Sequence, residues 1–311
     1  MKIAIILCCI RLGNVPIELN AKLCDQDNFP VELSSILESD VLPHYRQYFP
    51  SNPSYVDIST GQQKTHDNPF WGYGIHSYHD YLDRISRKEI SQRNIHGVLH
   101  ATRTAIWTQL FIELHELANK EWTYHRLFLA LAGAAHDIAR QDEGEDFWDF
   151  DSALWVKNYL SQQNLEKKQV DLYFNAISQK DPENRNFVSP EQQAIHDADV
   201  LEFHRELDNP MDFIKEELCF YHFDQLDVKF KEELIDEIQL FIYLSETKEI
   251  KNYLNEYSRD SLGDLLCLMQ TLHDNFNCFP HLTELLKCLI KPFKTQVSIL
   301  FPLIRNISHK I

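Results

Sequence analysis

Glycine is scarce in this chain, with 8 glycines among 311 residues. So few glycines argue against a Rossmann-type architecture, whose phosphate-binding turn depends on glycine, and against a β fold punctuated by glycine turns. The sequence also has no internal repeat, no low-complexity tract and no linker rich in glycine, serine or proline. Together with a hydrophobic content of 44%, this predicts one domain with a sizeable buried core.

Basic residues are outnumbered, because 30 lysines and arginines face 47 aspartates and glutamates, for a net charge of −17. A protein that binds the phosphate backbone of nucleic acid needs a basic face, so no nucleic-acid partner is predicted. The acidic balance suits a partner protein with a basic surface. The 7 cysteines are odd in number and form no Cys-x-x-Cys motif, which indicates a reduced, cytosol-like compartment.

Long apolar runs are also lacking. The longest, Ile3–Ile10 and Ile299–Ile304, fall far below the roughly 20 residues of a membrane-spanning helix, so no integral membrane segment is predicted. Met1-Lys2 and the run after it faintly resemble a signal peptide. The run is short and no clear cleavage site follows, so a buried strand or the start of a helix is the preferred interpretation.

The fold class follows from proline and helical periodicity. Five prolines predict that residues 1–65 form an irregular N-terminal segment, followed by an aromatic, histidine-rich loop at 66–81. We therefore expect an all-α domain over 1–311, with a catalytic core at 66–210 and C-terminal helices at 211–311. The predicted helices span roughly 79–92, 95–118, 122–140, 151–161, 165–179, 190–207, 210–220, 224–245, 247–257, 261–274 and, in pieces, 280–305.

Two predicted helices carry polar residues at one end of an apolar stripe. In the helix over 95–118, His96, His100 and Arg103 fall at i, i+4 and i+7, on one face. The helix over 122–140 has an apolar stripe that ends in His136 and Arg140. If the two helices pack antiparallel, their polar ends meet over the core and form a site.

A ligand set of histidines and aspartates can be read from this site. His100, the pair His136-Asp137 and Asp199 follow the order of the ligands of HD-type phosphohydrolases, which the segment resembles. Imidazoles and carboxylates from three helices can hold a divalent metal, which lowers the pKa of a bound water. The His-Asp dipeptide alone is weak evidence, because it recurs at 66–67, 79–80, 196–197 and 273–274.

Two further segments add candidate residues. The predicted helix that contains Asp199 also carries His196. An acidic loop with aromatic residues, residues 140–152, follows the helix of His136, and one of its carboxylates is expected to orient an imidazole of the site.

Taken together, Ile95-His-Gly-x-x-His-x-x-Arg103, His136-Asp-x-x-Arg140 with its Glu-rich loop, and Ile195-His-Asp-Ala-Asp199 resemble the phosphodiesterase domain of the SidE effector family and its stand-alone relatives. The resemblance spans roughly residues 65–210. It implies an HD-like fold and a metal-free mechanism without a cofactor. In that mechanism His96 is the nucleophile, His196 is the general acid, and Arg103 neutralises phosphate oxygens. The glutamate that holds one imidazole in its tautomer is assigned to Glu143 rather than Glu145, because Glu143 is nearer the end of the helix of His136.

Several of these residues also have structural interpretations. His100 fits a buried core histidine, and His136-Asp137 fits the hydrogen-bonded remnant of an HD site. Arg140 suits the C-terminal end of a helix dipole. Arg103 fits an ion-pair partner of Asp199 or Asp137, and the loop glutamates fit solvated charges. Glu143-Gly-Glu145 also matches the Glu-x-Glu of ADP-ribosyltransferases, but the other elements of those enzymes are missing.

The resemblance implies a phosphodiesterase that acts on ubiquitin bearing ADP-ribose or phosphoribose. Its products are either ubiquitin released from serine-linked substrate proteins or AMP released from ADP-ribosylated ubiquitin. It also implies a bacterial effector that is secreted into the cytosol of a host cell. Two alternatives remain open. One is a metal-dependent HD-type nucleotide phosphohydrolase that uses His100, His136, Asp137 and Asp199; the other is a degenerate module that binds ubiquitin or a nucleotide without turnover.

Overall fold

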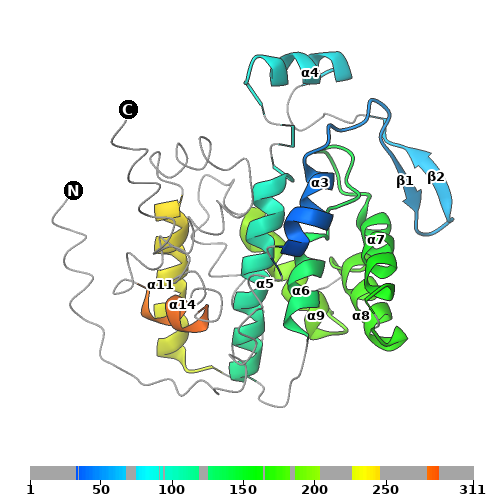
Figure 1. Cartoon of the computed structure of the whole chain (residues 1–311). Helices are drawn as coiled ribbons and strands as arrows, with labels where there is room; N and C mark the ends of the chain where they lie inside the picture. Colours follow the sequence, from blue (N-terminus) through cyan, green and yellow to red (C-terminus); the bar gives the residue numbers. More distant parts are fainter. Residues whose placement is uncertain are drawn as a thin grey trace. The chain divides into compact units, whose positions relative to one another are not determined.

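The structure of the protein is a computed structural model that describes residues 33, 35–67, 75–90, 92–93, 95–118, 125–163, 165–182, 186–203, 226–245 and 279–286 (Figure 1). It divides into two compact units. The core unit is formed by Leu33–Ile112 and Thr123–Asp208, and the second unit by Met1–Glu32, Glu113–Trp122 and Asn209–Ile311. All the predicted site residues lie in the core unit. That the whole chain forms one domain stays a prediction.

Helices dominate the described residues of both units. The described elements are η2 (a π-helix, Leu37–Val41), α3 (Leu42–Tyr45), β1 (Ser54–Asp57), β2 (Gln62–Thr65), α4 (Tyr78–Ser86), α5 (Val98–Ala118), α6 (Arg126–Ala134), α7 (Asp149–Ser161), α8 (Lys167–Ser178), α9 (Pro190–Phe203), α11 (Val228–Ser245) and α14 (Pro280–Leu285). Within the described ranges, β1 and β2 form the one sheet, an antiparallel hairpin. The predicted all-α class is therefore confirmed.

Helix α5 forms the buried centre of the core unit, where every side chain from His100 to Ile112 is buried. Helix α6 packs against it closely, because a Cβ atom on Gly133 would lie 2.3 Å from Oγ1 of Thr108. The two helices run antiparallel. Gln109 donates a hydrogen bond to the carbonyl of Arg126 at 3.3 Å, while His100 meets His136 beyond the far end of α6 at 3.4 Å. The predicted packing of two polar helix ends is confirmed.

Gly133→Ala is expected to lower the free energy of unfolding by about 1–3 kcal/mol, because the added methyl group overpacks the contact with Thr108. Thr108 cannot move aside easily, since its hydroxyl donates to the carbonyl of Thr104 at 2.7 Å. Urea unfolding gives the measurement. Alanine gains about 1 kcal/mol of helix propensity over glycine, so an unchanged or raised stability would contradict the close packing. Adding Thr108→Ala should recover part of the loss.

The range predicted to be irregular, residues 1–65, contains regular structure within its described part. Helix α3 contacts α6 through the hydroxyl of Tyr45, which donates to the carbonyl of Ala134 at 2.7 Å. The β1–β2 hairpin turns at Gly61, whose φ of +66° favours glycine. The side chain of Asp57 stabilises this turn by accepting from the backbone N–H groups of Ser59 and Thr60 at 2.9 and 3.1 Å. Such Asp- and Gly-containing turns are a hairpin signal. The prediction of irregular chain was therefore wrong for residues 54–65, which form the hairpin.

Two helix ends differ from the predicted ones. Helix α5 begins at Val98, so His96 precedes the helix and is not part of its stripe. Helix α6 ends at Ala134 because the imidazole of His136 folds back and its Nδ1 donates to the carbonyl of Gly133 at 2.7 Å. That bond satisfies one of the carbonyls left over at a helix C-terminus and leaves His136-Asp137 in a turn.

Other predictions fall on residues outside the described ranges. These are the helices at 210–220, 247–257 and 261–274, and residues 68–74 of the aromatic loop. Among the residues that are described, no helix combines the length and hydropathy needed to cross a membrane.

Candidate active site

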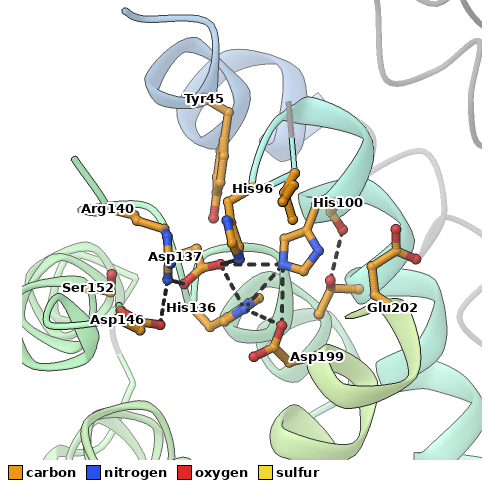
Figure 2. A network of polar contacts seen from close by, with 12 residues as sticks. Tyr45, His96, His100, His136, Asp137, Arg140, Asp146, Ser152, Asp199 and Glu202 are labelled. Atoms are coloured by element: carbon orange, nitrogen blue, oxygen red, sulfur yellow. Dashed lines mark hydrogen bonds and ion pairs between the residues drawn. The ribbon is translucent and has the colours of Figure 1, made fainter. Parts of the chain in front are cut away.

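Four side chains meet in the core unit: His100 of α5, His136 and Asp137 of the turn after α6, which are buried, and Asp199 of α9, which is 20% exposed (Figure 2). The Nε2 atom of His136 lies 3.3 Å from Oδ2 of Asp137 and 3.2 Å from Oδ1 of Asp199. The Nε2 atom of His100 lies 3.4 Å from the same two oxygen atoms. We call these four residues the histidine–aspartate cluster. The structure thus brings together the four residues predicted from the HD-like order.

Burial and neighbouring charges shift the pKa values of the two histidines in opposite directions. For His136, burial lowers the pKa, but the charges of Asp137 and Asp199 outweigh burial and raise it well above its usual value. For His100, burial is the stronger influence and lowers the pKa. Burial raises the pKa of both carboxyl groups, but the charge of His136 outweighs it together with the hydrogen bond from His100 at Asp137 and the charge of Lys180 at Asp199, so both pKa values lie well below their usual range. A neutral His100 therefore lies beside an imidazolium of His136 held between two carboxylates.

The cluster also fits a divalent metal by its donor set. One ligand atom from each of the four residues can be chosen so that all lie within 4.8 Å of one another. Two imidazole nitrogens and two carboxylate oxygens are suitable ligands for zinc or a similar ion. The hydrogen bond from Nδ1 of His136 to a carbonyl is of the kind that orients metal-binding histidines. A metal would have to displace the proton on Nε2 of His136.

His96 lies beside the cluster and is held by Glu143. Its Nδ1 is 2.6 Å from Oε2 of Glu143, and its Nε2 is 4.0 Å from Oδ2 of Asp137. The same carboxylate accepts the backbone N–H groups of Ile95 and His96 at 3.3 and 3.2 Å. Burial raises the pKa of Glu143, but its hydrogen bond with His96 is the main influence that outweighs burial, and the pKa is lowered. Glu145 is exposed, so Glu143 is the glutamate of the loop that contacts His96.

The loop that carries Glu143 is held by the buried side chain of Arg140. Its Nε donates to the carbonyl of Asp142 at 2.9 Å, one Nη donates to the carbonyl of Gly144, and the other lies 2.9 Å from Oδ2 of Asp146. The same Nη is 3.8 Å from Asp137. Burial lowers the pKa of Arg140, but the surrounding carboxylates, Asp146 first, raise it, so the side chain stays charged. Arg140 therefore supports both the loop and the cluster.

His196, on α9, is linked to the histidine–aspartate cluster through Asp181 and Lys180. Its Nδ1 lies 2.7 Å from Oδ1 of Asp181. Oδ2 of Asp181 contacts Nζ of Lys180 at 2.9 Å, and Nζ also lies 3.3 Å from Oδ2 of Asp199. The ring of His196 packs against that of Phe187 at 5.0 Å between centroids.

Arg103 pairs with a residue that the sequence did not indicate. Its Nε and Nη2 lie 2.7 and 2.6 Å from Oε1 of Glu202, whose other oxygen accepts from the indole of Trp107 at 3.3 Å. The ion pair expected with Asp199 or Asp137 is thus formed with Glu202, because α9 places that carboxylate one turn beyond Asp199. That Arg103 also neutralises phosphate oxygens stays a prediction.

Sequence reasoning missed Lys180, Asp181 and Glu202. Lys180-Asp181 follows the end of α8 and precedes Pro182, so the pair reads as an ordinary helix terminus. Glu202 reads as a solvated charge on α9, although it is 2% exposed. The one available signal was spacing, since Glu202 lies three residues after Asp199 and therefore on nearly the same side of the helix.

These features define a class: a helical protein in which a largely buried histidine–aspartate cluster lies beside a histidine that contacts the side chain of a glutamate. Comparison with known proteins agrees with it. The family model of the SidE phosphodiesterase (PDE) domain matches residues 61–257, which is more than half of the chain. The chain therefore belongs to the SidE phosphodiesterase domain family, and the predicted resemblance is confirmed. No curated protein and no solved structure gives a significant match, so the HD-like topology stays a prediction.

Proposed function

We propose that this phosphodiesterase uses His96 as a nucleophile and His196 as a general acid, without a metal. The observation that carries the proposal is the 2.6 Å contact between Nδ1 of His96 and the buried carboxylate of Glu143. A carboxylate only accepts hydrogen bonds, so the contact assigns the proton to Nδ1 and leaves the lone pair on Nε2. That nitrogen faces the cluster, where Asp137 is 4.0 Å away.

The chemistry follows in two balanced steps. Nε2 of His96 attacks the phosphorus, so that a P–N bond forms while the P–O bond to the leaving group breaks, and His196 donates a proton to the leaving oxygen. Water then attacks the phosphoramidate: a new P–O bond forms, the P–N bond breaks, and His196 takes the proton back. If a serine hydroxyl replaces water in the second step, the same site performs transfer instead of hydrolysis.

The substrate in this proposal is ubiquitin that bears ADP-ribose or phosphoribose. Family membership supports this choice, and so does the net charge of −17, which favours encounter with a basic protein surface. Cleavage of the pyrophosphate in ADP-ribosylated ubiquitin releases AMP, and cleavage of a phosphoribosyl-serine link releases ubiquitin from serine-linked proteins. The proposed place of action is the cytosol of a host cell, as for a secreted effector.

A second candidate is favoured by the donor set of the histidine–aspartate cluster. It is a metal-dependent phosphohydrolase, in which the four residues hold a divalent ion that activates water. In that reaction His100 and His136 are neutral ligands, whereas His96 has no direct role. A binding module without turnover is the third candidate, and an active preparation would exclude it.

A chelator experiment separates these candidates. We expect purified protein to release AMP from ADP-ribosylated ubiquitin at an unchanged rate after treatment with EDTA, and elemental analysis to find less than stoichiometric metal. Asp137→Asn should cost about tenfold or less, because it disturbs the orientation of an imidazole rather than a metal ligand. Asp83→Asn, an exposed carboxylate paired with Arg87 on α4, serves as the matched control.

Three results would contradict the metal-free proposal. Stoichiometric bound metal together with activity that EDTA removes would assign catalysis to a metal held by the histidine–aspartate cluster. A loss of several orders of magnitude in Asp137→Asn would point to the same conclusion, since an activated hydroxide would be lost. Absence of both AMP release and release of ubiquitin from serine-linked proteins under any condition would favour the binding module.

A further inference from the structure

Asp181 occupies a position relative to His196 that matches the position of Glu143 relative to His96. In each pair a carboxylate oxygen lies against Nδ1 of the imidazole, at 2.7 Å for Asp181 and 2.6 Å for Glu143. In each imidazole this contact leaves Nε2 pointing away from the carboxylate. The pairs come from different parts of the fold: Asp181 follows α8 and His196 lies on α9, whereas Glu143 lies in the loop before α7 and His96 precedes α5.

The buried side chain of Lys180 fixes the carboxylate of Asp181. Only 4% of this side chain is exposed, and its ammonium group lies 2.9 Å from Asp181, 3.3 Å from Asp199, 3.4 Å from Asp146 and 3.5 Å from Asp149. Three elements therefore converge on one cation: the end of α8, the start of α7 with the loop before it, and α9. An ammonium group donates in several directions at once, so it can hold all of these carboxylates.

The charge of Lys180 persists despite its burial. Burial lowers the pKa of the ammonium group, but Asp149, Asp199 and Asp146 outweigh burial and raise the pKa well above its usual value. For Asp181, burial raises the pKa, while His196 and Lys180 lower it to about 2. Asp181 is thus ionised near neutral pH. An ionised carboxylate cannot donate a hydrogen bond, so it accepts one from Nδ1 of His196.

We propose that Asp181, fixed in place by Lys180, is the positioning residue of His196. This inference rests on the proposed role of His196 as the general acid. Asp181 holds the proton on Nδ1, so that the proton given to the leaving oxygen comes from Nε2, and its negative charge stabilises the imidazolium before the transfer. The role resembles that of the aspartate in a Ser-His-Asp triad, where a carboxylate fixes the histidine tautomer, although 54% of the Asp181 side chain is exposed.

The kinetic test is Asp181→Asn, which keeps the size of the side chain but removes its charge and can present an amide N–H to Nδ1. We expect kcat to fall by about 10²–10⁴-fold with KM changed by less than about threefold. This loss is expected for cleavage of a phosphoribosyl-serine link, whose serine alkoxide needs the proton, and it should shrink for AMP or p-nitrophenol as the leaving group, which need little protonation. Asp181→Glu should recover part of kcat. Asp171→Asn on α8, whose partner is the half-exposed Lys157, is the matched control and should leave kcat unchanged.

Imidazole NMR gives a readout that does not depend on turnover. Long-range ¹H–¹⁵N spectra should show the neutral form of His196 with its proton on Nδ1 in the wild type and a shift toward Nε2 in Asp181→Asn, with His196→Gln used for assignment. An inactive wild type with that tautomer shift would overturn the proposed function and support the positioning role. An active wild type with an unchanged tautomer and kcat in Asp181→Asn would overturn the positioning role alone.

Discussion

Replacing His96 by alanine is expected to lower turnover by about 10³-fold or more while the protein stays folded. In the proposed mechanism the variant removes the nitrogen that attacks phosphorus, so no phosphoramidate forms. The backbone around it should persist, because Glu143 still accepts the N–H groups of residues 95 and 96 at 3.3 and 3.2 Å. AMP release from ADP-ribosylated ubiquitin measures turnover, and circular dichroism with thermal unfolding measures the fold.

His79→Ala is the control for that variant, since His79 is an exposed histidine on α4. It should keep wild-type turnover. If His96→Ala keeps turnover within about tenfold of wild type, His96 is not the nucleophile, because loss of an attacking atom costs far more. A large loss of helical signal in His96→Ala would instead indicate a structural histidine, and His96→Gln would then be compared at equal folded fraction.

His196→Gln is expected to lower kcat by about 10²–10⁴-fold and to change the pH dependence of the remaining activity. In the two-histidine mechanism His96 must be neutral and His196 must be protonated, so the wild-type profile of kcat against pH should be bell-shaped. Its acidic limb reflects protonation of the nucleophile, and its alkaline limb reflects loss of the proton from the acid. The variant should retain the acidic limb and lose the alkaline one.

The comparison is made from pH 5 to 9 on one substrate, with unfolding monitored at each pH. Stability must be followed because the cluster holds charged groups whose pKa values depend on the fold. A profile that is flat over this range in the wild type would argue against any mechanism with two titrating histidines. An alkaline limb that survives in His196→Gln would assign the general acid to another group.

The helical pattern could be predicted because it depends on local periodicity. The predicted helices at 151–161, 165–179 and 190–207 correspond to α7, α8 and α9, with ends displaced by a few residues. Periodicity could not show where a side chain, instead of the next turn of backbone, makes a hydrogen bond to a helix carbonyl and so ends the helix. Helix α6 stops before His136 because that imidazole caps the helix, and this bond depends on the folded position of the ring. The hairpin of β1 and β2 was missed because five prolines suggested irregular chain.

The residues of the candidate site were also only partly predictable from the sequence. His100, His136, Asp137 and Asp199 could be recognised from their order in the sequence, and they lie together. Glu143 was chosen over Glu145 for its nearness to the helix, and the loop does place it against His96. Lys180 and Asp181 could not be found, because Lys180 is buried among carboxylates that are distant in sequence and Asp181 contacts His196 only in the folded chain. Charged residues are usually solvated, and only the fold identifies the exceptions.

The β1–β2 hairpin bears on where the folded catalytic unit begins. The family match starts at residue 61, which lies in the turn between the two strands. A fragment that began there would keep β2 and lose the bonds of Ser54 to the side chains of Gln141 and Trp148, at 3.0 and 2.9 Å, which brace the loop of Glu143 from both ends. It would also lose Tyr45, which bonds to the end of α6. We therefore expect the boundary of a stable fragment to lie upstream of the boundary of the shared family segment, before α3.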